Sequence, residues 1–235
     1  MIAGHHTMLA PTGAPPAAQR CVVLDGASYA LNTAVGAWTT TNQGSLSMAC
    51  WVWISGLPAS GPVSVLTLEQ PNADNGAQLD PISSATRKFR VLFQSSAFIG
   101  PTEQEVGGIG AWHHYAFSYD YGTKAFAGYV DGTQVLTSTP NRWLSARATL
   151  GVSLGVRNSG VATAGKLNGK IANANIYLRA LSSAEVTALA AFVDAIPDDA
   201  DHQWAFANDD FADTGTAATK WNLTGYGNPT FEDVT

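Results

Sequence analysis

Short runs of alternating apolar and polar residues, separated by turn residues, recur along the chain from residue 21 onward. Such runs predict β-strands, and their close spacing is typical of a sandwich or barrel. The stretch 69–87 carries few apolar residues and is predicted to be a long polar loop. The predicted strands are 21–24, 29–31, 45–54, 63–68, 89–93, 112–119, 125–130, 133–137, 150–156, 169–178 and 203–206.

The predicted strand 45–54 is apolar on both faces. Side chains alternate between the two faces of a strand, which here places Met48, Cys50, Val52 and Ile54 on one face and Ala49, Trp51 and Trp53 on the other. A strand of this kind lies in the middle of a two-layer stack or has its outer face covered.

The predicted strand 169–178 is expected to bury one face. The same alternation places Ala172, Ala174, Ile176 and Leu178 on an apolar face, and Ile171, Asn173, Asn175 and Tyr177 on a more polar one. We expect the first face to be buried.

One helix is predicted, and it starts at Ser182. Glu185 follows three residues later and completes a capping box. The residues Val186, Leu189, Ala190 and Val193 recur at helical spacing before Pro197. This apolar stripe needs a sheet to cover.

Residues 1–20 are predicted to form an extended arm rich in proline and alanine. Proline lacks the N–H donor that a sheet interior requires. We expect this arm to bind other protein subunits. Residues 21–235 form a single predicted domain, in which 203–235 supply closing strands and a tail. The acidic runs 198–201 and 209–213 are read as solvated turns.

Charged residues make up 13% of the chain, about half the roughly 25% usual in soluble domains. Such a neutral polar surface favours a virion or extracellular protein. With a net charge of −6, the chain lacks the positively charged surface that nucleic-acid binding requires. We therefore expect no nucleic-acid partner. No apolar run reaches membrane-spanning length, and no signal peptide is visible.

Cys21 and Cys50 are expected to be buried free thiols, although one disulfide bridge is an alternative.

Three segments, read in order, resemble the laminin G-like branch of the concanavalin A-like lectin/glucanase superfamily. They are 24–31 with 46–52, then the "WHHYA…YD…YVDG" stretch at 112–132, and 167–171 with 177–185. The resemblance implies an all-β jelly-roll sandwich of two antiparallel sheets with a short helix in its C-terminal half. A "W-F…D.G…LTG" segment that precedes the first strand in many members lies here at 204–225.

Catalytic members of that superfamily carry a Glu-x-Asp-x-x-Glu pattern on one strand, and this spacing is missing here. The nearest carboxylate pair, Glu103 and Glu105, shares a predicted loop with glycines. Glycoside hydrolysis needs two carboxylates across the scissile bond. We therefore expect a protein that is not an enzyme.

Two kinds of ligand site remain. Related modules often hold calcium at a loop rim, and carboxylate and amide oxygens of that kind come here from Asn72, Asp74, Asn75 and Asp80. These residues are equally common in turns. His113 and His114 are adjacent on a strand and point to opposite faces, so the two cannot chelate one metal ion in the ordinary way. The family resemblance implies that both are structural.

Sugar recognition uses an exposed aromatic ring flanked by hydrogen-bonding groups. The aromatic residues that strand periodicity explains least, with one neighbouring arginine, are Trp38, Tyr121, Arg142 and Trp143. Each aromatic residue equally suits core packing at an open end of the sandwich.

The sequence therefore predicts a non-catalytic structural or adhesion module with a lectin-like fold. The first hypothesis is a virion-surface protein, such as a phage capsid-decoration, fibre or tail-associated protein, that binds host glycans. The alternative is a secreted or cell-surface carbohydrate-binding module, with calcium as its candidate cofactor.

Overall fold

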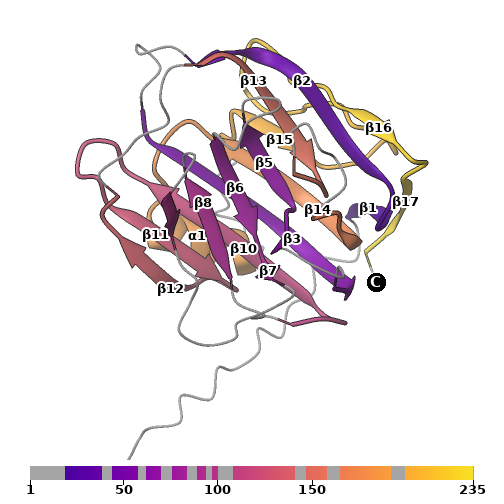
Figure 1. Cartoon of the computed structure of the whole chain (residues 1–235), viewed down its shortest axis with the longest axis horizontal. Helices are drawn as coiled ribbons and strands as arrows, with labels where there is room; N and C mark the ends of the chain where they lie inside the picture. Colours follow the sequence, from indigo (N-terminus) through magenta and orange to yellow (C-terminus); the bar gives the residue numbers. More distant parts are fainter. Residues whose placement is uncertain are drawn as a thin grey trace, which may run out of the picture.

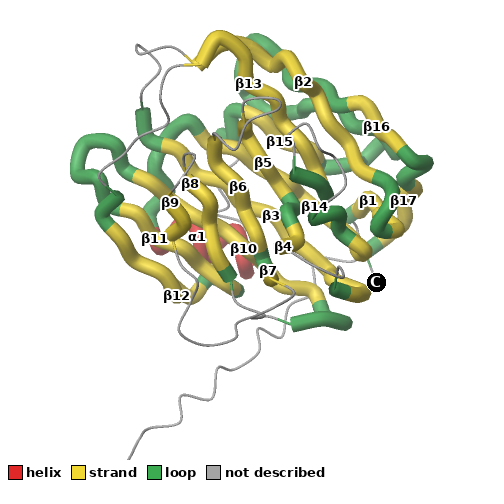
Figure 2. The backbone as a smooth tube through the Cα atoms, viewed as in Figure 1, coloured by secondary structure: helices red, strands yellow, loops and turns green. Residues whose placement is uncertain are grey.

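The computed structural model describes residues 19–38, 44–57, 62–69, 76–83, 89–93, 97–99, 108–140, 147–157, 165–191 and 199–234. These residues form two large antiparallel sheets that lie face to face, with a helix behind one of them (Figures 1 and 2). The jelly-roll sandwich expected from the sequence is confirmed. No helix in the described part is long and apolar enough to cross a membrane.

Within the described residues, the first sheet has eight strands. Their order is β12, β11, β10, β3, β14, β1, β17, and β15 pairs with β14. Their bounds are β1 (Arg20–Asp25), β3 (Leu46–Gly56), β10 (Trp112–Tyr119), β11 (Phe126–Val130), β12 (Thr133–Ser138), β14 (Asn168–Tyr177), β15 (His202–Trp204) and β17 (Thr230–Asp233).

The second sheet, over the same described ranges, has seven strands in the order β16, β2, β13, β5, β6, β8, β9. A short pair, β4 with β7, lies beside it. The bounds are β2 (Tyr29–Trp38), β4 (Pro62–Val63), β5 (Leu66–Glu69), β6 (Gly76–Asp80), β7 (Ile82–Ser83), β8 (Arg90–Phe93), β9 (Ala97–Ile99), β13 (Arg147–Leu154) and β16 (Thr224–Tyr226).

Strand β3 is buried on both faces, as its sequence predicts. It pairs with β10 on one side and β14 on the other. Met48, Cys50 and Val52 face the core between the sheets, whereas Ala49 and Trp51 belong to two smaller clusters on the outer face. Cys21 and Cys50 are free and buried, as expected, and they lie in different clusters.

Helix α1 (Ser183–Ala191) covers part of that outer face. Its buried residues Val186 and Leu189 pack with Ala49, Ala116 and Tyr129. The capping box is confirmed, because the Ser182 amide donates to the Glu185 carboxylate at 2.7 Å and the Glu185 amide donates to Ser182 Oγ at 3.3 Å.

The long loop expected at 69–87 is wrong, because β6 crosses the middle of the seven-stranded sheet there. Ala77 and Leu79 face the core, and Gln78 and Asp80 are buried although they are polar. Asp80 accepts a hydrogen bond from Ser64 Oγ at 2.8 Å and pairs with Arg90 at 3.1 Å. Partners distant in sequence therefore satisfy side chains whose polarity suggested exposure.

Along 169–178 the expected burial of Ala172, Ala174 and Ile176 is confirmed, but the expected alternation is wrong, because a β-bulge interrupts β14 between Ala172 and Asn175. Asn173 has a φ of +48°, and the side-chain parity changes across it. Ala172 therefore lies on the outer face while Ala174 lies in the core. Tyr177, expected on the polar face, is buried, and Leu178 is 42% exposed.

The C-terminal segment returns to both sheets. β16 pairs with β2 in one sheet, and β17 pairs with β1 in the other. Asp213 joins this segment to β15, since its carboxylate accepts hydrogen bonds from His202 Nδ1 at 2.6 Å and from the amide of Gln203 at 3.0 Å. The acidic runs are therefore not simply solvated turns.

Candidate functional site

Tyr121 is the member of the predicted sugar-binding set whose side chain the structure describes. It lies in the turn after β10 and packs partly buried against the core. Lys124 Nζ is 3.3 Å from the centroid of its ring, so an ammonium group covers one ring face. The Trp38 side chain, Arg142 and Trp143 lie outside the described residues, and sugar stacking by this set stays a prediction.

The predicted calcium site is described only at Asp80. Its carboxylate is buried and engaged by Arg90 and Ser64. Burial raises the pKa of Asp80, while Arg90 and the Ser64 hydroxyl act in the opposite direction. Asn72, Asp74 and Asn75 lie outside the described residues. In the described ranges no three His, Cys, Asp or Glu side chains are grouped to hold a metal, and calcium stays a prediction.

His113 and His114 lie on opposite faces of β10, and Asp131 holds this end of the strand. Its carboxylate contacts His113 Nδ1 at 2.7 Å and accepts the His114 backbone amide at 2.8 Å. The buried His114 ring lies 5.5 Å from the ring of Trp51. Burial lowers the pKa of His114 to about 4, against the opposing charge of Asp131, so its imidazole is neutral at physiological pH.

A groove of about 470 Å³ lies on the outer face of the eight-stranded sheet, beside the start of α1. This volume falls within the ~300–1,000 Å³ of small-ligand sites. Two hairpin strands, the turn after β10 and the segment before α1 form its walls. The groove is lined by Ser118, Asp120, Thr123, Ala125, Phe126, Ala127, Tyr129, Gln134, Thr137, Ala180, Leu181 and Ser182.

Neighbouring pairs on β11 and β12 shape the groove floor. Tyr129 pairs with Gln134, and Ala127 pairs with Thr137. The small Ala127 leaves space between larger neighbours. Burial raises the pKa of Tyr129, so its hydroxyl stays protonated. The floor therefore combines an aromatic side chain with an amide and a hydroxyl, which both donate and accept hydrogen bonds.

Asp120 contributes the groove's one carboxylate group. Its Oδ1 already accepts the amides of Gly122 at 2.7 Å and Thr123 at 3.2 Å, which holds the turn. The other ionisable group in the lining is the Tyr129 hydroxyl. The arrangement suits binding of a neutral, hydroxyl-rich molecule.

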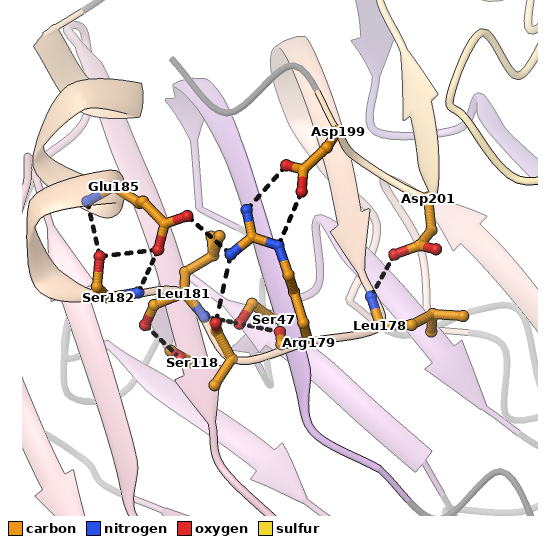
Figure 3. A network of polar contacts seen from close by, with 10 residues as sticks. Ser47, Ser118, Leu178, Arg179, Leu181, Ser182, Glu185, Asp199 and Asp201 are labelled. Carbon is orange, nitrogen blue, oxygen red and sulfur yellow. Dashed lines mark hydrogen bonds and ion pairs between the residues drawn. The ribbon is translucent and has the colours of Figure 1, made fainter. Parts of the chain in front are cut away.

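The segment 178–182, whose residues 180–182 line the groove, is held in place by side chains on β3 and β10 (Figure 3). Ser47 Oγ on β3 donates to the Arg179 carbonyl at 2.9 Å and accepts the Leu181 amide at 3.0 Å. Ser118 Oγ on β10 donates to the Leu181 carbonyl at 2.8 Å. These bonds fix one wall of the groove before any ligand arrives.

Arg179 extends this network toward α1 and the chain that follows it (Figure 3). Its guanidinium pairs with Asp199 at 2.8 Å and with Glu185 at 2.7 Å. Hydrogen bonds with Asp199 raise the pKa of Arg179, and Arg179 in turn lowers the pKa of Asp199. The charges beside the groove are therefore already paired with one another.

Sequence reasoning did not identify Tyr129, Gln134 or Thr137 as site residues. It did predict their hairpin, but their alternation looks the same as that of any half-exposed hairpin. The groove exists because residues 180–182, distant in sequence, lie beside the turn and the hairpin. No local signal marks that contact.

Comparison with protein families finds a match to the model described as the concanavalin A-like lectin/glucanases superfamily, over residues 25–187. Comparison with curated protein sequences finds no match.

Several solved structures are similar in fold. A heptameric SAP-like pentraxin from Limulus polyphemus has a TM-score of 0.61 at 11% identity, covering 94% of this chain and 97% of that chain. A putative carbohydrate binding protein from Bacteroides ovatus has a TM-score of 0.63 at 11% identity, covering 92% of this chain and 60% of that one.

Domain 4 of an extracellular arabinanase from Geobacillus stearothermophilus, solved in complex with arabinotriose, has a TM-score of 0.55 at 23% identity. The match covers 72% of this chain and 75% of that chain. At these identities the likeness concerns the fold alone.

Proposed function

Since this chain belongs to the concanavalin A-like lectin/glucanase superfamily, we propose that it is a non-catalytic carbohydrate-binding module whose ligand occupies the groove beside α1. The observation that carries the proposal is the lining of that groove. It offers the amide of Gln134, the hydroxyl groups of Thr137 and Ser182 and the aromatic Tyr129, with one carboxylate. Sugars are bound by such groups.

Two similar folds support a sugar as the ligand. One belongs to a putative carbohydrate binding protein, and the other was solved with arabinotriose. The lining favours a neutral oligosaccharide over an acidic one, because it holds one carboxylate and offers no cation to pair with a carboxylate or sulfate. Glycoside hydrolysis uses two carboxylates, whereas one lines this groove.

A glycan array screened with the full chain tests the proposal, in calcium and again in EDTA. Gln134→Ala and Thr137→Ala are expected to weaken binding about fivefold to tenfold, since each removes about 1 kcal/mol of hydrogen bonding. Thr133→Ala is the matched control, because it is exposed on the same strand but does not line the groove. Binding to no glycan, or equal binding by all three variants, contradicts the proposal. Loss in EDTA would support the calcium proposal.

A second part of the proposal concerns the location in which the module acts. The low charge and the proline-rich residues 1–20 support a virion-surface role in which that arm attaches to other virion subunits. Mass spectrometry of particles banded from a lysate of the source tests it. A chain found only in the medium supports the alternative, a secreted or cell-surface module.

A further inference from the structure

We propose that a second carbohydrate-binding surface, the tyrosine platform of Tyr29, Tyr226 and Thr224, lies at the edge of the seven-stranded sheet and stacks one pyranose ring on Tyr226. This inference rests on the proposed function for the class of its ligand, but it uses another part of the molecule. Strand β16, which carries Tyr226, lies on the side of the view opposite β12 (Figure 1).

The platform begins with a cross-strand pair on an edge strand. β16 ends the sheet, and Tyr226 pairs directly with Tyr29 on β2. Their rings stack with centroids 5.2 Å apart and planes 14° from parallel. Lys166 Nζ lies over the Tyr29 ring, 5.0 Å from its centroid, and donates to the Ala27 carbonyl at 3.1 Å. The Tyr29 ring is therefore fixed by contacts with two residues.

Backbone geometry holds Tyr226 in an outward orientation. A Cβ at Gly225 would meet the Phe211 ring at 2.8 Å, so that face of β16 points inward. By alternation, Thr224 and Tyr226 share the outward face. Gly227 and Asn228 follow with φ of +70° and +60°, which turns the chain tightly. Little conformational entropy remains to be lost when a ligand binds.

Tyr226 is 43% exposed, and it is the aromatic residue among the exposed large hydrophobic side chains of the described ranges; the other two, Ile109 and Leu178, are aliphatic. Thr224 beside it is exposed as well. Residues two apart on a strand are separated by about 7 Å, so a ring stacked on Tyr226 brings its hydroxyl groups within reach of Thr224.

The size and chemistry of the platform favour a sugar over a protein partner. Stable protein interfaces bury about 800 Å² on each side, far more than one half-exposed tyrosine among glycine, threonine and asparagine supplies. The negative face of an aromatic ring attracts polarised C–H groups. Pyranosides with equatorial hydroxyl groups present an uninterrupted C–H face. The ligand class that fits the tyrosine platform is therefore the β-linked gluco-oligosaccharides.

The test is calorimetric titration of the full chain with cellohexaose. Tyr226→Ala is expected to weaken binding about tenfold, Tyr226→Phe to stay within about twofold of the original, and Thr224→Ala to lose about threefold. Ile109→Ala is the matched control, since it truncates a comparably exposed side chain outside both proposed sites and should bind as the original does. Circular dichroism checks that each variant is folded.

Equal binding by Tyr226→Ala and the original chain overturns the platform. So does a Tyr226→Ala effect seen only in self-association by analytical ultracentrifugation, which would mark a protein contact instead. Gln134→Ala separates the two proposals. If glycans bind and only Gln134→Ala weakens their binding, the platform proposal fails and the proposed function stands. If the chain binds no glycan, both proposals fail.

Discussion

Asp213 and His114 show how much of this protein depends on single buried polar groups. Asp213 accepts hydrogen bonds from His202 and from the amides of Gln203, Gly215 and Trp221. Burial opposes its ionisation, but these hydrogen bonds outweigh that effect and lower the pKa of Asp213. The Asp213 carboxylate thus ties together segments that local sequence would assign to an exposed loop.

His114 makes stability depend on pH in a predictable direction. Burial lowers its folded-state pKa to about 4, below the unfolded value of about 6.5. The unfolded chain therefore binds the proton first, and stability falls as pH drops from about 6.5 to 4. His114→Phe should leave the free energy of unfolding nearly unchanged at pH 7, since His114 Nδ1 has no hydrogen-bond partner among the described residues.

Urea unfolding of both proteins between pH 7 and pH 4 measures this effect. As the pH falls from 7 to 4, the free energy of unfolding of His114→Phe should rise by about 3 kcal/mol relative to that of the original chain. His113→Phe is the comparison, because it removes the bond to Asp131 and should cost stability already at pH 7. Parallel curves for the original and His114→Phe would refute the assignment.

At the scale of elements, the segment 178–182 joins β14 to α1, and its residues 180–182 line the groove. Its backbone is bonded to Ser47 and Ser118, and its Arg179 side chain to Glu185 and Asp199 (Figure 3). The capping box at Ser182 therefore stabilises the helix and the groove together.

Ser182→Ala tests that coupling. Loss of the cap should cost about 1 kcal/mol of unfolding free energy, because the Glu185 amide loses its side-chain acceptor. Ser183→Ala, one residue later and equally exposed, should stay within about 0.5 kcal/mol. Chemical denaturation of the three proteins measures the difference, and equal losses for both serines would show that the cap contributes nothing specific.

Element prediction succeeded where periodicity was local and failed where tertiary contacts decided. The hairpin β11–β12 and the helix start follow from Asp131-Gly132 and from Ser182 with Glu185. β6 was missed because its polar Gln78 and Asp80 are buried among other strands. The bulge at Asn173 was missed because a positive φ in one residue leaves no periodic signal.

At the scale of the whole molecule, the last strands close both sheets on the same side. β16 covers the edge of β2, and β17 covers the edge of β1. Phe231 on β17 packs 5.2 Å from the ring of Phe211. These two strands add backbone hydrogen bonds to both sheets and bury apolar side chains, so the domain should need its C-terminus.

Removing residues 224–235 should abolish cooperative unfolding. Both sheets would lose an edge strand, and the core would lose Phe231 and the buried Val234. Thermal unfolding followed by near-ultraviolet circular dichroism measures this loss. A chain lacking residues 1–18 keeps every described strand and is expected to unfold cooperatively. A cooperative transition at an unchanged midpoint in the C-terminal truncation would contradict the closing role.

The β class, the strand β3 buried on both faces, the capped helix and the hairpin turns follow from the order of residues alone, because each depends on periodicity or on bonds between near neighbours. The groove and the tyrosine platform do not. Gln134 and residues 180–182 line one groove, and Tyr226 stacks on Tyr29, only after the sheets have assembled. Such an arrangement of distant segments leaves no trace in the local pattern, so the tertiary structure alone decided where the groove and the platform lie.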